Sequence, residues 1–311
     1  MHFLFEPGFF SSAPVHTAAA IGAVTAVVSA VVGIFTVVRS QSFAGHALTD
    51  VATTGGSGAF LLGVNPLAGF IGGGIIGGGA MEAIGVERAR SRDVATGIVL
   101  GAATGLSALF LYLDTTRTAT TGATQQILFG SIFTIDPSII PTVVLLSVAT
   151  LLVVGAIHRP LLLSSVSPEL AAARGISLRI VGLLFMLALA VSVGLSSIAI
   201  GSILSTALLI GPAATAVRLT TKLRTAMVVA CIVGVAATWL GILFAYDSAY
   251  WDTSSQGIPV SFFIVALVFV LYLVSGLPFV RRLSGRREGG QAASPTPQPG
   301  DEGLALVASE G

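Results

Sequence analysis

The sequence predicts an all-α protein, a polytopic bundle of transmembrane helices. Hydrophobic residues make up 54% of the 311 residues and charged residues only 9%, and the mean hydropathy of +0.95 is outside the range of soluble domains. Uncharged runs of Leu, Ile, Val, Ala and Gly also reach about 20 residues, the length that crosses the hydrocarbon core of a bilayer. The chain is therefore expected to be an integral membrane protein.

Apolar runs of this length recur through most of the chain. We expect about nine spans, at 17–38, 46–64, 67–84, 94–113, 140–157, 178–196, 198–217, 226–246 and 259–280. Only "VNPL" separates the second span from the third, and the sixth and seventh meet in "GLSSIAIG". Either pair is a hairpin or includes a broken helix, so eight to ten spans are compatible with the sequence.

The basic residues predict the orientation of these spans. Lys and Arg near span ends collect on the cytoplasmic side of a membrane. With the N-terminus outside and the C-terminus in the cytoplasm, every Lys and Arg except Arg117 lies inside. The outer segments then carry acidic residues, namely Glu6, Asp114, Asp136, Asp247 and Asp252.

The two ends of the chain differ from its apolar body. The N-terminal segment lacks the pattern of a secretory signal, so we expect the mature chain to begin near Met1. Residues 288–311 are polar and rich in Gly and Pro, which predicts a disordered cytoplasmic tail. Residues 1–287 are expected to form one transmembrane domain, and the single cysteine, Cys231, excludes an intrachain disulfide.

Glycine is concentrated in runs such as "GFIGGGIIGGGAMEAIG" at 69–85. Small residues three and four apart let helix backbones approach closely, which matters where lipid offers no hydrophobic drive for association. This pattern favours tight helix packing over a phosphate-binding loop.

One stretch, "GHALTD" at 45–50, places an imidazole and a carboxylate inside a predicted span. His46 and Asp50 are four residues apart and so share a helix face. Asp50 follows Arg39 by eleven residues, which at about 1.5 Å per residue puts it roughly 16 Å inward, near the bilayer centre. A lone Asp there costs about 2.5–3.5 kcal/mol and needs a cavity, a partner or an ion.

The residues alone leave three interpretations of this pair open. Asp50 accepts a hydrogen bond from His46 or from a Ser or Thr of a neighbouring helix, or the pair binds a divalent metal through nitrogen and oxygen, or it relays protons. Further weak oxygen ligands lie nearby, at Thr49, Thr53, Thr54 and Ser57.

Other ionisable residues and the missing motifs limit the chemistry. We expect structural or interfacial roles for Glu82, Asp93 and His158. No GxxxxGK[ST] loop is present and the only lysine is Lys222, so any ATP hydrolysis must occur on another chain. Without HExxH or GxSxG, an enzyme has no visible zinc motif or nucleophile, and we expect a transport subunit instead.

Four segments follow one another along the chain: "VVRSQSFAGHALTDVATTGG", "ILFGSIF" at 127–133, "SPELAAARGIS" at 167–177 and "IGSILSTALLIGPAATAVRL" at 200–219. In this order, and through most of residues 17–280, the chain resembles the membrane (permease) subunit of bacterial ABC-type zinc, manganese and iron uptake transporters. His46 stands where that family usually has an acidic residue, and Asp50 stands where it has His. The resemblance implies that His46 and Asp50 are the metal ligands of the translocation path.

The resemblance also implies an assembly in the bacterial cytoplasmic membrane. Two copies of the chain form the pathway, two ABC ATPase subunits bind beneath them, and an extracellular solute-binding protein delivers the metal. No permanent cofactor and no nucleic acid are expected. The ATPase-coupling residues are expected to be Ser167, Pro168, Glu169, Leu170, Ala171, Ala172, Arg174 and Gly175.

The leading hypothesis is therefore a homodimeric ABC importer permease that moves zinc or manganese, with iron as a further option, by alternating access. A mixed nitrogen and oxygen pair suits all three metals. The alternatives are a permease for a metal chelate of the siderophore type and an ion-coupled secondary transporter that uses Asp50. An intramembrane enzyme is the weakest alternative, because no catalytic group is evident.

Overall fold

The structure is a computed structural model that describes residues 8–85, 89–117, 122–130, 132–251 and 257–277. Its long helices are α1 (Ala13–Val38), α2 (Ser42–Leu61), α3 (Pro66–Gly85), α4 (Ala89–Arg117), α6 (Ile140–Val166), α8 (Leu178–Ile200), α9 (Ser202–Leu219), α10 (Leu223–Ser248) and α11 (Val260–Ser275). The short helices are η1 (Phe9–Ser11), α5 (Ala123–Phe129), η2 (Ile132–Thr134), η3 (Pro137–Ile139) and α7 (Pro168–Ala173). The proposed tail at 288–311 lies outside the described residues.

The prediction of an all-α membrane bundle is confirmed, and each expected span corresponds to one long helix. In the described part of the chain, six helices are long and apolar enough to cross a membrane by themselves, and these are α1, α4, α6, α8, α9 and α10. The apolar helix α11 is shorter, with 16 residues. Helices α2 and α3 have 20 residues each, and in α2 the Gly, Thr and ionisable residues lower the hydropathy.

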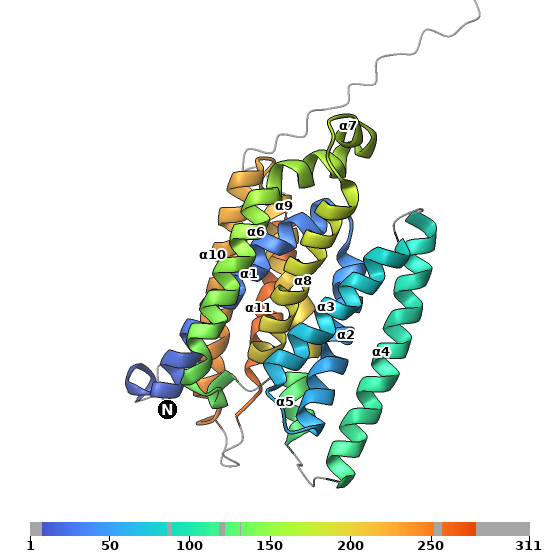
Figure 1. Cartoon of the computed structure of the whole chain (residues 1–311). Coiled ribbons are helices and arrows are strands. Elements are labelled where there is room, and N and C mark those ends of the chain that lie inside the picture. The colour runs from blue at the N-terminus through green and yellow to red at the C-terminus, as the bar shows by residue number, and fades with distance from the viewer. Residues whose placement is uncertain (1–7, 86–88, 118–121, 131, 252–256, 278–311) are drawn as a thin grey trace, which may run out of the picture.

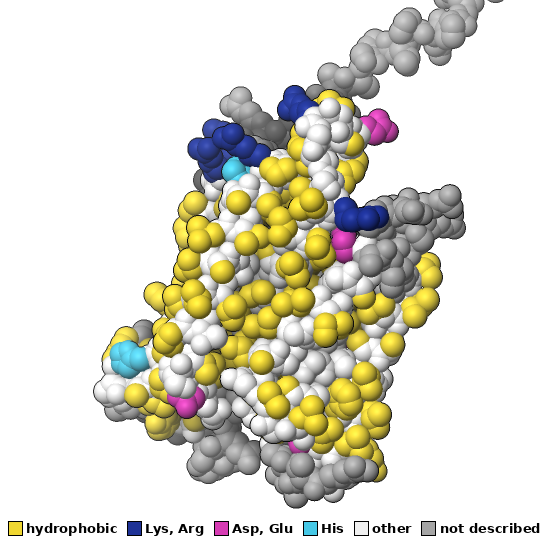
Figure 2. Space-filling view, in the orientation of Figure 1, with side chains coloured by type: hydrophobic (Ala, Val, Ile, Leu, Met, Phe, Trp, Pro, Cys, Tyr) yellow, Lys and Arg dark blue, Asp and Glu magenta, His cyan; other side chains and the backbone are white. Residues whose placement is uncertain are grey.

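The long helices run side by side along one axis (Figure 1). The described N-terminal residues lie at one end of the bundle, here called the N-terminal end, and α7 lies at the other, the α7 end. Lys and Arg side chains on the visible face gather at the α7 end (Figure 2). This distribution matches the expected collection of positive charge on one side of a membrane.

Helices α1 and α8 form the centre of the bundle. Most of each is buried, whereas α4 and α6 keep most of their surface exposed. Phe35 of α1 and Phe185 and Leu189 of α8 belong to one buried apolar cluster. A serine pair crosses the same interface, because the hydroxyl oxygens of Ser29 and Ser196 lie 2.6 Å apart. The exposed apolar surface of the outer helices is what lipid chains would cover.

The glycine run brings α3 into backbone contact with α2, as the sequence predicts. A Cβ atom added to Gly55 of α2 would overlap the carbonyl oxygen of Gly69, and one added to Gly69 would overlap that of Gly55. At Gly73 an added Cβ would lie 2.9 Å from both the Cα of Gly55 and the carbonyl oxygen of Val51. The two helices can pack this closely only because side chains are missing on both sides.

The predicted boundary between the sixth and seventh spans is displaced by a few residues. Helix α8 continues to Ile200, and the break occurs at Gly201, where φ is +84°. Gly130, with φ at +77°, packs directly against the backbone of Gly201. Glycine is required at both positions because the left-handed backbone and the close approach each disfavour a side chain.

We predict that Gly73→Ala lowers the unfolding free energy by about 1–3 kcal/mol, because its Cβ must displace the α2 backbone. Thermal unfolding of the purified chain in detergent measures this loss. The matched control is the neighbouring Gly72→Ala, since an added Cβ there meets nothing within 4 Å. Equal melting temperatures for the two variants would contradict the packing assignment.

Candidate functional site

His46 and Asp50 both lie on α2, one helical turn apart, as predicted. A three-residue connection at 39–41 leads into this helix from α1. The side chain of His46 is exposed and that of Asp50 is half-buried. Both polar groups are therefore accessible from outside the helix.

The imidazole of His46 contacts helix α9. Its Nδ1 lies 3.2 Å from the hydroxyl oxygen of Thr206. The hydroxyl oxygen of Thr49 lies 3.3 Å from the same Thr206 oxygen. This contact orients the ring and leaves Nε2 as the second nitrogen for another partner.

The carboxylate of Asp50 contacts helix α4 instead. The hydroxyl of Thr104 donates to Oδ2 of Asp50 at 3.1 Å. One turn further along α2, the hydroxyl of Thr54 lies 2.7 Å from the carbonyl oxygen of Ala103, to which it donates. Of the three interpretations of the pair, the hydrogen bond to a neighbouring Thr is thus present, and it leaves the other carboxylate oxygen for another partner.

The expected weak ligands divide into two groups. The hydroxyl of Thr49 belongs to the cluster with His46 and Thr206. Buried Thr53 donates to the carbonyl oxygen of Thr49 at 2.8 Å, and Ser57 donates to that of Thr54 at 3.1 Å. Both side chains therefore bond to their own helix rather than pointing free donors at the pair.

The candidate site offers one imidazole nitrogen, from His46, and one carboxylate, from Asp50. Among the described residues, no group of three or more His, Cys, Asp and Glu side chains is arranged to hold a metal ion. Imidazole and carboxylate suit divalent transition metals, but two ligands fall short of the four that zinc takes or the larger sets of manganese.

The segment expected to bind an ATPase forms the short helix α7 at the α7 end (Figure 1). The hydroxyl of Ser167 caps it by accepting from the backbone N–H of Leu170 at 3.3 Å, and Gly175 follows it with φ at +76°. Ala171 is buried, whereas Leu170 is 47% exposed. The remaining residues expected in this role are also largely exposed, namely Pro168, Glu169, Ala172 and Arg174.

Two of the expected outer acidic residues are not on the surface. Asp114 and Asp247 are 2% and 0% exposed, because both lie in the last turns of helices, α4 and α10, that pack into the bundle. Asp136 is exposed and caps η3 by accepting from the backbone N–H of Ser138 at 2.8 Å, which lowers the pKa of its carboxyl. Glu6 and Asp252 lie outside the described residues.

Glu82 is placed by packing. Its carboxylate fills the space that a side chain at Gly182 of α8 would need. His158 of α6 bonds through Nδ1 to the carbonyl oxygen of Gly155 in its own helix. The structural role expected for Glu82 and the interfacial one expected for His158 stay predictions, and the side chain of Asp93 is not described.

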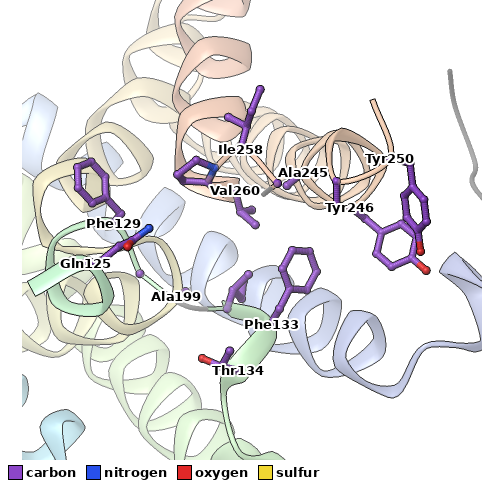
Figure 3. A pocket seen from close by; sticks show the side chains of 15 residues that line it. Gln125, Phe129, Phe133, Thr134, Ala199, Ala245, Tyr246, Tyr250, Ile258 and Val260 are labelled. Carbon is purple, nitrogen blue, oxygen red and sulfur yellow. The ribbon is translucent and has the colours of Figure 1, made fainter. Parts of the chain in front are cut away.

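A cavity of about 500 Å³ opens at the N-terminal end and was not expected from the sequence. Phe129, Phe133, Tyr246 and Tyr250 give it an aromatic lining, with Gln125 and Thr134 as polar groups (Figure 3). The described residues that line it include no carboxylate, imidazole or thiol. It therefore lacks the ligand types that a transition metal prefers.

Fold and site together define a polytopic membrane protein of the transporter class. The chain belongs to the ABC 3 transport family, whose pattern it matches over residues 13–276. It is thus the membrane permease subunit of an ABC transporter.

The relatives of this chain carry manganese in their names. It is 29% identical to the manganese transport system membrane protein MntC of Listeria innocua, over 78% of this chain and 84% of that protein. It is 30% identical to the manganese import system permease protein ScaB of Streptococcus parasanguinis, over 83% of this chain and 87% of that protein.

Solved structures share the fold. PsaBC from Streptococcus pneumoniae in complex with Fab matches with a TM-score of 0.71 at 23% identity, over 90% of this chain and 98% of that one. A structure described as an inward-facing conformation of a metal-chelate type ABC transporter matches with a TM-score of 0.69 at 15% identity, covering 86% and 87% of the two chains.

We predict that Thr54→Val weakens the attachment of α4 to α2 by about 0.6–1 kcal/mol, because the variant loses the interhelical bond to Ala103. Thermal unfolding in detergent reads out the change. Thr116→Val is the control, since the hydroxyl of Thr116 bonds to its own helix, at 2.8 Å from the carbonyl oxygen of Tyr112. A larger loss in the control than in Thr54→Val would contradict the assignment.

Proposed function

We propose that this chain imports a free divalent transition metal, with manganese as the preferred substrate and zinc or ferrous iron as weaker ones. The observation that carries the proposal is the accessible His46 and Asp50 pair of α2 in a chain whose relatives are named manganese permeases. A nitrogen donor, a carboxylate and nearby hydroxyls suit manganese, which favours oxygen ligands more than zinc does.

Two copies of the chain form the translocation path, with α2 of each copy facing the other. The two-fold arrangement common in homo-oligomers supplies each donor twice, so His46 and Asp50 of both copies give four protein ligands. The accessible edges of these side chains support this arrangement. Separation of the copies during the transport cycle lowers the number of ligands and releases the ion.

The N-terminal end faces the outside and the α7 end faces the cytoplasm of a bacterial cell. The Lys and Arg side chains at the α7 end support this orientation (Figure 2). Two ATPase subunits bind α7 from the cytoplasm through the helix-in-groove mode, and a solute-binding protein delivers the metal at the N-terminal end. ATP binding and hydrolysis on those subunits switch the site from outward to inward exposure.

His46→Ala and Asp50→Ala are each expected to lower ATP-driven manganese uptake at least about tenfold, since loss of even an outer-shell partner costs a metal site about 10–100-fold. The assay is uptake by vesicles that contain the permease, its ATPase and its binding protein, with zinc and ferrous iron as competitors. His158→Ala and Asp136→Ala serve as controls of the same residue types away from the site.

Three outcomes of this assay would overturn the proposal in different ways. Unchanged manganese uptake in both variants would mean that the pair only packs the bundle. Uptake of a ferric siderophore but no free metal, with tolerance of His46→Ala, would favour the metal-chelate permease. Uptake without ATP that collapses with the membrane potential would favour an ion-coupled transporter.

Leu170→Asp is expected to weaken ATPase binding by at least about tenfold, because exposed apolar anchors in a groove carry much of the binding energy of an interface. Co-purification of the two subunits at a range of concentrations measures the affinity. The control is Leu62→Asp, since Leu62 is 78% exposed and directly follows α2 in the connection to α3. Equal binding by both variants would place the ATPase elsewhere.

A further inference from the structure

Arg39 joins four helices at the α7 end. It is the C-cap residue of α1, directly before the connection to α2. Its guanidinium donates through Nη1 to the hydroxyl of Ser164 at 3.1 Å, and lies 3.4 Å from both the hydroxyl of Ser165 and the carbonyl oxygen of Leu161. These three partners belong to the last turns of α6.

The partners of Arg39 lie in a segment that leads straight into α7. Helix α6 contains Pro160, which lacks the N–H that would bond one turn back, so the helix is weakened there. Beyond it, Ser164 and Ser165 both donate to the carbonyl oxygen of Leu161. Ser167 ends α6 and caps α7 at once. A displacement of α7 is therefore passed directly to the turn of α6 that Arg39 holds.

On its other side Arg39 is tied to the start of α2. Its Nε donates to the side-chain oxygen of Gln41 at 3.3 Å. Ser40 between them has φ at +55°, a conformation that is uncommon for a residue with a side chain. The backbone N–H of Gln41 donates to the carbonyl oxygen of Thr36 at 2.9 Å. This connection is too short and too well bonded to absorb a movement of Arg39 by itself.

The guanidinium is also fixed against the core. Its central carbon lies 5.4 Å from the ring centroid of Phe185 of α8, within the range of a cation–π contact. Phe185 is fully buried. The contact gives Arg39 a fixed support on the central helix, so a shift of α6 is transmitted along the side chain rather than lost in rotamer changes.

We propose that Arg39 is a positioning residue that couples α7 to the metal pair, by linking the end of α6 to the start of α2. His46 lies seven residues beyond Arg39, and α2 begins at Ser42, so a tilt at the start of α2 moves His46 and Asp50. The inference rests on the proposed function, in which the ATPase acts on α7 and the metal binds the pair.

The first test measures manganese transported per ATP hydrolysed in the complete transporter. Arg39→Gln is expected to lower this ratio about threefold to tenfold, since residues along such networks alter coupling by about that factor, with ATP hydrolysis kept within about twofold. Arg39→Lys retains the positive charge but loses the several N–H donors of the guanidinium. Its ratio of manganese transported to ATP hydrolysed is expected to lie between those of Arg39→Gln and the unchanged protein. Arg159→Gln, an exposed arginine of the same helix end, is the control.

The acceptor side is tested separately with Ser164→Ala combined with Ser165→Ala. This double variant leaves Arg39 in place and is expected to lower the ratio as Arg39→Gln does. Adding Arg39→Gln to it is expected to cause no further loss, because groups that act through one contact are non-additive. Should Arg39→Gln fail to assemble, the serine variant alone decides the question.

The second test follows the helices and needs no metal. After Cys231→Ser removes the single cysteine, one spin label per chain is placed at Phe43 of α2 or at Val166 of α6, which are 45% and 83% exposed. Distances between the two copies are measured without nucleotide and with trapped ATP. When Arg39 is present, ATP is expected to change the distance between the two copies at both label positions. In Arg39→Gln, ATP is expected to change only the distance measured at the α6 position.

The outcomes separate the inference from the function on which it rests. An unchanged transport ratio and an unchanged α2 shift in Arg39→Gln or in the serine variant would overturn the role of Arg39. A transporter that moves none of the three metals, yet shows the Arg39-dependent shift of α2, would overturn the proposed substrate and retain the coupling.

Discussion

The backbone contact between α2 and α3 is the constraint on which the site depends. In lipid there is no hydrophobic driving force for helix association, so close packing has to supply the free energy of association. Gly55 and Gly73 allow the two backbones to touch, and Gly77 accommodates Val51 in the same interface. This contact fixes the rotation of α2 about its axis. His46 and Asp50 consequently lie on a face of α2 that is not packed against α3.

Hydroxyl groups hold α2 on its remaining sides. Thr206 reaches it from α9, and Thr104 and the carbonyl group of Ala103 reach it from α4. Each such bond contributes only about 1 kcal/mol, far less than a charged or metal contact. Helix α2 is thus fixed by backbone packing against α3 and by hydroxyl hydrogen bonds to the helices that flank the pair.

The sequence predicted the spans and the shared face of the pair because both follow from local patterns, hydropathy and the helical period. The contacts of the pair could not be predicted from local sequence patterns, since Thr206 lies 160 residues from His46 and Thr104 lies 54 residues from Asp50. The burial of Asp114 and Asp247 and the aromatic cavity likewise depend on how distant helices meet.

An importer must bind its ion and then let it go, and the geometry of this chain serves both steps. A closed cage of four ligands within one chain would retain a metal, because nothing short of unfolding would open it. In the proposed dimer each copy contributes one imidazole and one carboxylate, so the affinity for the ion depends on the distance between the two copies. In this proposal a tilt of α2 changes the number of protein ligands around the ion, and Arg39 is the residue through which an ATPase bound at α7 imposes that tilt.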